Sequence, residues 1–219
     1  MNYENPSIKF RYKGAKRICV FANYRSASSY IHNTITTVNS NVPLGEYFAE
    51  VNPNIDGPCE NKDTNNTFSY EKAIKNLQSI PRYTVKLMAN QLQFDDTKIK
   101  SVLDIVDRVV YVYRRDFKAQ GLSLLSVAPH KLYSVMGFRE SGQAPSIIDV
   151  PILSQEYIDS MTNILRDNYT CMAKYIKTYP GEIICLEDIV NQKPYLKTTV
   201  WNQPIPEFED FNVEKVLFG

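Results

Sequence analysis

Residues 18–30 read ICVFANYRSASSY, and this stretch decides the fold that the sequence predicts. Its first five residues form a continuous apolar run, as expected of a β-strand that is buried on both faces of a sheet. Small polar residues follow, and then Ile31, Ile35 and Val38 recur at helical spacing. The stretch therefore predicts a buried strand that turns directly into a helix, the opening unit of a parallel α/β sheet.

Further strand-like runs alternate with helical patterns along the rest of the chain. The strand-like runs are residues 83–88, 109–113 and 183–186, and the helical patterns are residues 70–79, 99–106 and 154–176. This alternation is typical of βαβ units, so we expect an α/β fold, a three-layer sandwich with a central parallel sheet.

Three segments lack such patterns. Residues 51–68 are rich in Asn, Asp and Pro, and residues 128–151 are rich in Pro, Gly and Ser, so both are expected to be loops. The tail from about residue 203 is acidic and interrupted by prolines, and we expect it to pack loosely. The length of 219 residues suits a single domain over residues 1–219.

Composition excludes several classes of protein. Lys and Arg total 25 and Asp and Glu total 24, and this balance gives no support to a nucleic-acid binder. No apolar run approaches the roughly 20 residues of a membrane span. The N-terminus does not resemble a secretory signal, so we expect a cytoplasmic protein. The four cysteines and two histidines lack metal-ligand spacing, so no metal is predicted.

The turn after the first strand has the chemistry of an anion site. The backbone N–H groups of a strand-to-helix turn and of the helix N-terminus converge on one point. Ser26, Ser28 and Ser29 add hydroxyl donors, and Arg25 adds a planar, permanently charged guanidinium. An ordinary polar turn with an N-cap serine would give the same pattern, and the spacing leaves both interpretations open.

This turn is not a Walker A loop. The required GxxxxGKS/T is absent, because the turn has no glycine and carries Arg where the lysine would stand. A P-loop ATPase or kinase of the usual type is therefore not predicted.

A second polar group follows the strand at residues 109–113. Arg114 and Arg115 come at its end, and a helix is expected to begin near Asp116. Ser123 lies seven residues beyond Asp116, two helical turns later and hence on the same face. An arginine and this serine together would suit a second phosphate, although for this element taken alone an exposed Arg-Arg-Asp capping cluster is the better explanation.

In this order, the two groups resemble elements of the sulfotransferases that use 3′-phosphoadenosine 5′-phosphosulfate, and most closely the bacterial trehalose-sulfating branch. Residues 24–30 are similar to the family's 5′-phosphosulfate loop, and residues 115–123 to its 3′-phosphate element. Residues 43–48 are similar to the segment that carries a catalytic glutamate, and residues 185–189 to a strand end that reads YEDL. The resemblance spans residues 18–190. It departs from the family at Ala27, where a glycine is usual, and after Lys86, where Leu87 and Met88 replace Thr-His.

The resemblance implies a P-loop NTPase-like sulfotransferase fold and a role for each matching residue. Glu46 would be the catalytic base, and Arg25 would neutralise charge at the bridging oxygen. The donor nucleotide would be bound by Arg25, Ser26, Ala27, Ser28, Ser29, Arg115 and Ser123, with Arg114 as a substitute for Arg115. The donor would need no metal, and the acceptor would be a small molecule or glycan with a hydroxyl.

Two alternatives remain. The same fold would suit a P-loop-type nucleotide kinase, and a non-catalytic nucleotide- or anion-binding module would keep the loops without a base. If Glu46 is not the base, the next candidates are His32, Lys86 and the residues of 128–151.

Overall fold

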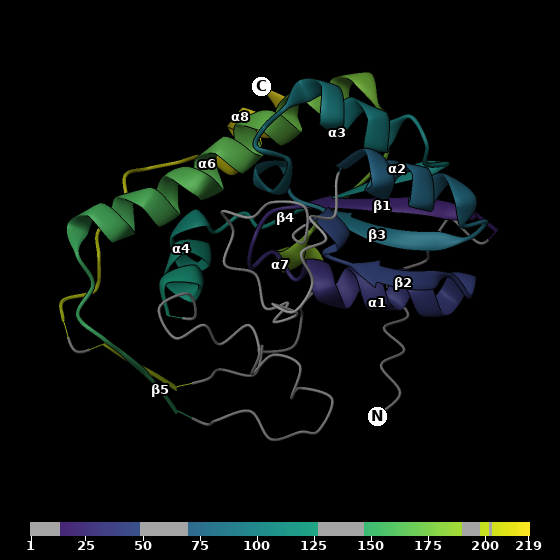
Figure 1. Ribbon diagram of the computed structural model, residues 1–219. Helices are drawn as coiled ribbons and strands as arrows, with labels where there is room; N and C mark the ends of the chain where they lie inside the picture. The colour runs from purple at the N-terminus through teal and green to yellow at the C-terminus, as the bar shows by residue number, and fades with distance from the viewer. Residues whose placement is uncertain (1–13, 49–69, 127–146, 190–197, 202) are drawn as a thin grey trace.

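The computed structural model describes residues 14–48, 70–126, 147–189, 198–201 and 203–219 (Figure 1). Five strands form one all-parallel sheet in the order β2-β3-β1-β4-β6. They are β1 (Arg17–Ala22), β2 (Val42–Gly45), β3 (Tyr83–Leu87), β4 (Arg108–Tyr113) and β6 (Glu182–Cys185). A separate pair of parallel strands consists of β5 (Ile147–Val150) and β7 (Thr198–Trp201).

Helices flank the five-stranded sheet on both sides (Figure 1). They are α1 (Ser28–Asn39), α2 (Tyr70–Ser79), the 3₁₀ helix η2 (Ala89–Leu92), α3 (Asp96–Leu103), α4 (Phe117–Leu125), α6 (Gln155–Thr178), α7 (Leu186–Ile189) and α8 (Val213–Phe218). Helix α1 packs on one face, and the core of the other face is built from α2, α3, α6 and α8. The predicted α/β architecture with a central parallel sheet is confirmed.

Strand β1 is buried on both faces, as its apolar run predicts. Cys19 and Phe21 belong to the core beneath α2, α3 and α6, whereas Ile18 and Val20 belong to the core beneath α1. All four side chains are fully buried. A strand with no solvent-facing side must be apolar at every position, which is why the run does not alternate.

The neighbouring strands β1 and β4 send the chain in opposite directions. After β1 the chain continues through α1 to β2, at one edge of the sheet, and after β4 it reaches β6 at the other edge. Such a divergence leaves a crevice outside the carboxyl ends of the two strands, and open α/β sheets bind their ligands there. The topology therefore predicts that a ligand would bind beside the segments that follow β1 and β4.

Two expectations need correction. Residues 147–150 fall in the expected loop at 128–151 but form β5, while residues 51–68 and 128–146 lie outside the described residues. The tail is not loosely packed at its end, because Val213 and Leu217 of α8 are buried in the core and Phe211 packs against Phe117 at 4.7 Å between ring centroids. The acidic residues and prolines of the tail made these three apolar side chains hard to recognise as core residues in the sequence. In the part of the chain that the structure describes, no helix is long and apolar enough to cross a membrane.

Candidate functional site

The turn between β1 and α1 is fixed by buried hydrogen bonds. The side-chain amide of the fully buried Asn23 donates to the carbonyl oxygen of Leu165 in α6 at 2.8 Å. The Oδ1 atom of Asn23 accepts a hydrogen bond from the backbone N–H of Tyr24. The backbone carbonyl oxygen of Asn23 accepts one from the hydroxyl of Ser26 at 2.7 Å. The turn is therefore built into the core and holds its backbone in one conformation.

Two residues of this turn have left-handed backbone conformations. Arg25 has a φ of 58° and Ala27 a φ of 63°, and each such conformation costs a non-glycine residue roughly 1–2 kcal/mol. Ala27 is the N-cap of α1, and no side chain caps the helix there. The N-cap is therefore not a serine, which removes the simplest structural explanation of the serine-rich sequence.

A buried lysine lies beside this turn. Lys86 is the residue before the last of the neighbouring strand β3, and its Nζ atom donates to Ser29 Oγ at 3.0 Å and to Glu46 Oε1 at 2.8 Å. Only 7 % of the Lys86 side chain is exposed, against 33 % of the Glu46 side chain. Gln91 in η2 also donates to Glu46, at 3.4 Å from Oε2. A cation, a hydroxyl and a carboxylate thus meet at the carboxyl end of β3.

Arg25 and Ser123 are also brought together. The Nε atom of Arg25 donates to Ser123 Oγ at 3.0 Å, which joins the turn after β1 to helix α4. Helix α4 begins behind the N-cap Asp116, as predicted, and the Asp116 side chain accepts from the N–H of Ala119. Ser123 therefore faces the turn between β1 and α1, where Arg25 is its partner.

Arg115 has different partners. Its guanidinium binds Asp188 of α7 at 3.2 Å and Glu214 of α8 at 3.0 Å, and 47 % of its side chain is exposed. The Nε atom of Arg114 lies 3.7 Å from Glu187 Oε1, and that nitrogen has no hydrogen-bond partner. Both arginines stand at the end of β4 as predicted, but the structure pairs them with carboxylates and not with Ser123.

Glu187 occupies the backbone donors at the end of β4. Its carboxylate accepts from the N–H groups of Arg115 at 2.9 Å and Asp116 at 3.2 Å. Burial works to raise the pKa of Glu187, but these hydrogen bonds and one from Cys185 outweigh burial and lower the pKa. The protein thus supplies an anion of its own to the turn after β4.

Two of the alternative bases, His32 and Lys86, differ in their surroundings, while residues 128–146 lie outside the described residues. His32 is buried under the sheet, with Nε2 at 2.9 Å from the carbonyl oxygen of Thr84, and burial lowers its pKa. It has the contacts of a core side chain. Lys86 instead contacts Ser29 and Glu46 beside the turn after β1. The signal in the sequence was a lysine inside the otherwise apolar strand YTVKL, because lysine is almost never fully buried without a partner.

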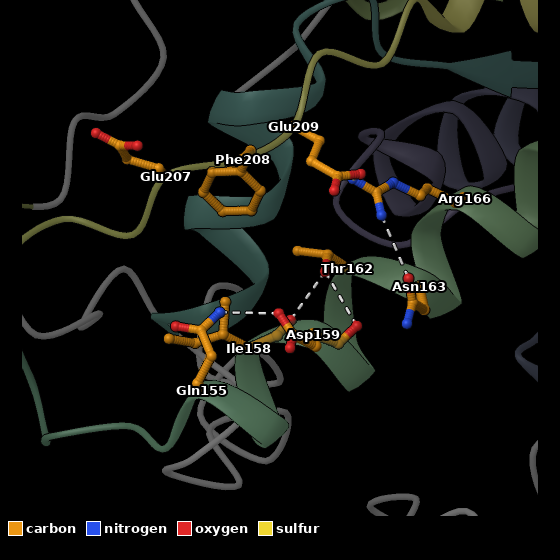
Figure 2. Close-up of a pocket in the computed structure, with 9 residues that line it drawn as sticks. All are labelled: Gln155, Ile158, Asp159, Thr162, Asn163, Arg166, Glu207, Phe208 and Glu209. Atoms are coloured by element: carbon orange, nitrogen blue, oxygen red, sulfur yellow. Dashed lines mark hydrogen bonds and ion pairs between the residues drawn. The ribbon is translucent and has the colours of Figure 1, made fainter.

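A hollow of about 370 Å³ lies elsewhere, between α6 and residues 207–209 (Figure 2). The ring of Phe208 stands on one side of it and Asp159 and Thr162 on the other, while Arg166 pairs with Glu209 at 3.1 Å. None of the predicted site residues lines this hollow. It is polar and open, and its geometry alone points to no particular ligand.

Comparisons with known proteins add no family. No protein-family model matches the chain, and a search of curated proteins finds no match either. Among the described residues, no group of three or more His, Cys, Asp or Glu side chains is arranged to hold a metal ion. The firm result is an α/β fold with a five-stranded parallel sheet and a polar site at its carboxyl edge.

Proposed function

We propose that this protein binds an anionic nucleotide at the carboxyl ends of β1, β3 and β4 and transfers a sulfuryl group from 3′-phosphoadenosine 5′-phosphosulfate to a hydroxyl. One observation carries the proposal: the Lys86 ammonium is buried within 3.0 Å of both Ser29 and Glu46, next to the strained turn after β1. Burying an ammonium is expensive, and a site for an anion gives it a use.

The turn would hold the 5′ end of the donor. Its backbone N–H groups run from Ser26 and the N-cap Ala27 to Ser28 and Ser29, the first residues of helix α1, where the helix dipole favours negative charge. The Lys86 ammonium and the Arg25 guanidinium supply positive charge on two sides of this turn. Charges fixed in advance in this way stabilise a leaving group without rearrangement during the reaction.

The proposed transfer is a single displacement at sulfur. The acceptor oxygen forms a bond to sulfur while the bond from sulfur to the bridging oxygen breaks, and that electron pair leaves on the 5′-phosphate. The acceptor proton goes to the Glu46 carboxylate. The products are a sulfate ester and adenosine 3′,5′-bisphosphate, so atoms and charge balance without a further reactant. Positioning and charge stabilisation do most of the catalytic work in such loose transfers.

The 3′-phosphate is the less supported part of the proposal. Ser123 already faces Arg25, so it suits an anion shared between the turn and α4. Arg115 would have to leave Asp188 and Glu214, whereas Arg114 would leave only one ion pair of 3.7 Å. Arg114 is therefore the easier of the two arginines to redirect towards a ligand. We propose that Arg114, and not Arg115, binds the 3′-phosphate.

The test has a binding arm and a transfer arm. Calorimetry with adenosine 3′,5′-bisphosphate should detect binding in EDTA, and donor labelled in the sulfuryl group should pass its label to a hydroxyl acceptor, also in EDTA. Binding without transfer to any acceptor would support the non-catalytic anion-binding module. Activity that appears only when Mg²⁺ is restored would support the kinase alternative. No binding to either nucleotide would remove the proposal.

A further inference from the structure

One buried hydroxyl joins the two segments of the candidate site. Tyr169 of α6 is fully buried, and its oxygen accepts the backbone N–H of Arg114 at 3.0 Å, directly after β4. The same hydroxyl donates to Gln120 Oε1 in α4 at 2.7 Å. The carbonyl oxygen of Arg114 is more distant, at 3.3 Å, so the single proton is best used on Gln120.

Gln120 extends this connection to the other segment. It is fully buried, and its Nε2 atom donates to the carbonyl oxygen of Tyr24, the residue before Arg25. Three hydrogen bonds therefore run in sequence from the Arg114 N–H through Tyr169 and Gln120 to Tyr24. They connect the backbone after β4 with the backbone after β1 through the interior.

We call these three hydrogen bonds the relay. Their chemistry suits a fixed distance between the backbone after β1 and the backbone after β4. Burial raises the pKa of Tyr169, so its hydroxyl stays protonated and keeps donating at physiological pH. The ring of Phe211 stacks on the Tyr169 ring at 6.3 Å between centroids, which restrains the side chain from one side. Buried hydrogen bonds whose groups are all satisfied are directional and rigidify the segments they join, so together with packing they can hold a spacing to within about 0.5 Å.

We propose that Tyr169 and Gln120 are positioning residues, and that their relay sets the spacing between the segments after β1 and β4 for a ligand with two separate anionic groups. The proposal rests on the proposed function for the choice of ligand. A ligand that uses both segments needs the spacing, and a ligand that uses only the turn after β1 does not. The relay therefore acts on the preference for the doubly phosphorylated nucleotide and not on binding in general.

The experiment compares two ligands across three proteins. Affinities for adenosine 3′,5′-bisphosphate and for adenosine 5′-phosphate are measured by calorimetry in the parent, in Tyr169→Phe and in Tyr111→Phe. Tyr169→Phe should weaken the bisphosphate about tenfold and leave the monophosphate within about threefold. Tyr111→Phe is the matched control, because it removes the hydroxyl of another fully buried tyrosine, which lies against the carbonyl oxygens of Tyr175 and Tyr179 at the C-terminal end of α6 and away from the three hydrogen bonds.

An equal loss for both ligands, or the same change in the control, would show a structural role only and overturn the proposal. A second measurement needs no ligand. Gln120→Met does not touch Arg114, yet it should speed hydrogen exchange of the Arg114 amide about tenfold if the relay is coupled. An unchanged Arg114 amide would overturn the relay. If the parent binds neither nucleotide while this exchange effect appears, the proposed function fails and the relay stands.

Discussion

The segments after β1 and β4 both lie at the carboxyl ends of the strands of one sheet, yet their basic side chains have different partners. After β1 and β3, Arg25 and Lys86 face serine hydroxyls and Glu46, and Lys86 is almost completely buried. After β4, Arg114 and Arg115 pair with carboxylates that come from residues 187–214. The comparison shows that the end of a strand fixes the backbone position of a basic residue. The position of its charged group depends on partners that are distant in the sequence.

The two groups also differ in what their ion pairs contribute to stability. Exposed pairs such as Arg115 with Asp188 contribute little to stability, so a ligand can displace them at little cost. Removing one partner of a buried pair leaves an uncompensated charge and is much more damaging. The site after β1 is thus preformed, and the one after β4 would have to be rearranged. Four predictions test this contrast.

The largest effect is expected at Glu46. Glu46→Gln keeps the shape of the side chain but cannot accept the acceptor's proton, so single-turnover transfer should fall at least about a hundredfold. Donor affinity should not fall, because Arg25, Lys86 and the turn still hold the nucleotide, although Lys86 loses its carboxylate partner and the folded protein is destabilised. The control is Glu71→Gln on the exposed face of α2, which should change neither quantity. Turnover close to that of the parent would remove Glu46 from the mechanism.

The next effect concerns the segment after β4. The parent should prefer adenosine 3′,5′-bisphosphate over adenosine 5′-phosphate by roughly tenfold to a hundredfold, the value of a charged hydrogen bond. Arg114→Met should reduce this preference more than Arg115→Met, because Arg115 is tied to two carboxylates. Arg108→Met, at the start of β4, should leave it unchanged.

Either of two outcomes would change this interpretation. A larger loss in Arg115→Met would return the 3′-phosphate to Arg115, against the pairing in the ligand-free protein. Equal parental affinity for the two nucleotides would mean that the segment after β4 binds no phosphate at all.

A smaller effect is expected at Ala27, which lies within the preformed turn. Ala27→Gly removes the strain of a φ of 63° and should stabilise the protein by about 1 kcal/mol in urea unfolding. Ala173→Gly in the middle of α6 is the control and should destabilise by about 1 kcal/mol, as expected for a helix interior. A loss of stability in Ala27→Gly would mean that the turn relaxes to another conformation in solution.

The smallest effect is on pH dependence and involves Glu187. Its pKa is lowered in the folded protein, so it binds fewer protons there than in the unfolded chain. Its contribution to stability is therefore present above the ordinary carboxyl pKa and is lost as the pH falls through the lowered value. Urea midpoints measured between neutral and acidic pH should fall less steeply in Glu187→Gln than in the parent. Parallel curves would exclude Glu187 as an ionised ligand of the β4 end.

The sequence determined four of the five strands of the central sheet, and β2 was not among them. The apolar runs at residues 18–22 and 109–113 are strands because a strand buried on both faces must be apolar throughout, and this pattern is local. Helix starts are local in the same way, since the side chains of Asp95 and Ser154 accept hydrogen bonds from backbone N–H groups in the first turns of α3 and α6. Local hydrogen bonding and burial are sufficient to read such elements from a single chain.

The tertiary structure decided which of the candidate residues meet. Lys86 and Glu46 are forty residues apart and form a pair only because β3 lies beside β2 in the sheet. Arg115 and Ser123 have the spacing that was expected of a phosphate-binding pair. Arg115 instead pairs with carboxylates of α7 and α8 and does not meet Ser123. The direction of a long charged side chain depends on the nearest opposite charge in space, and its position follows from the whole fold, so no local pattern in the sequence specifies it.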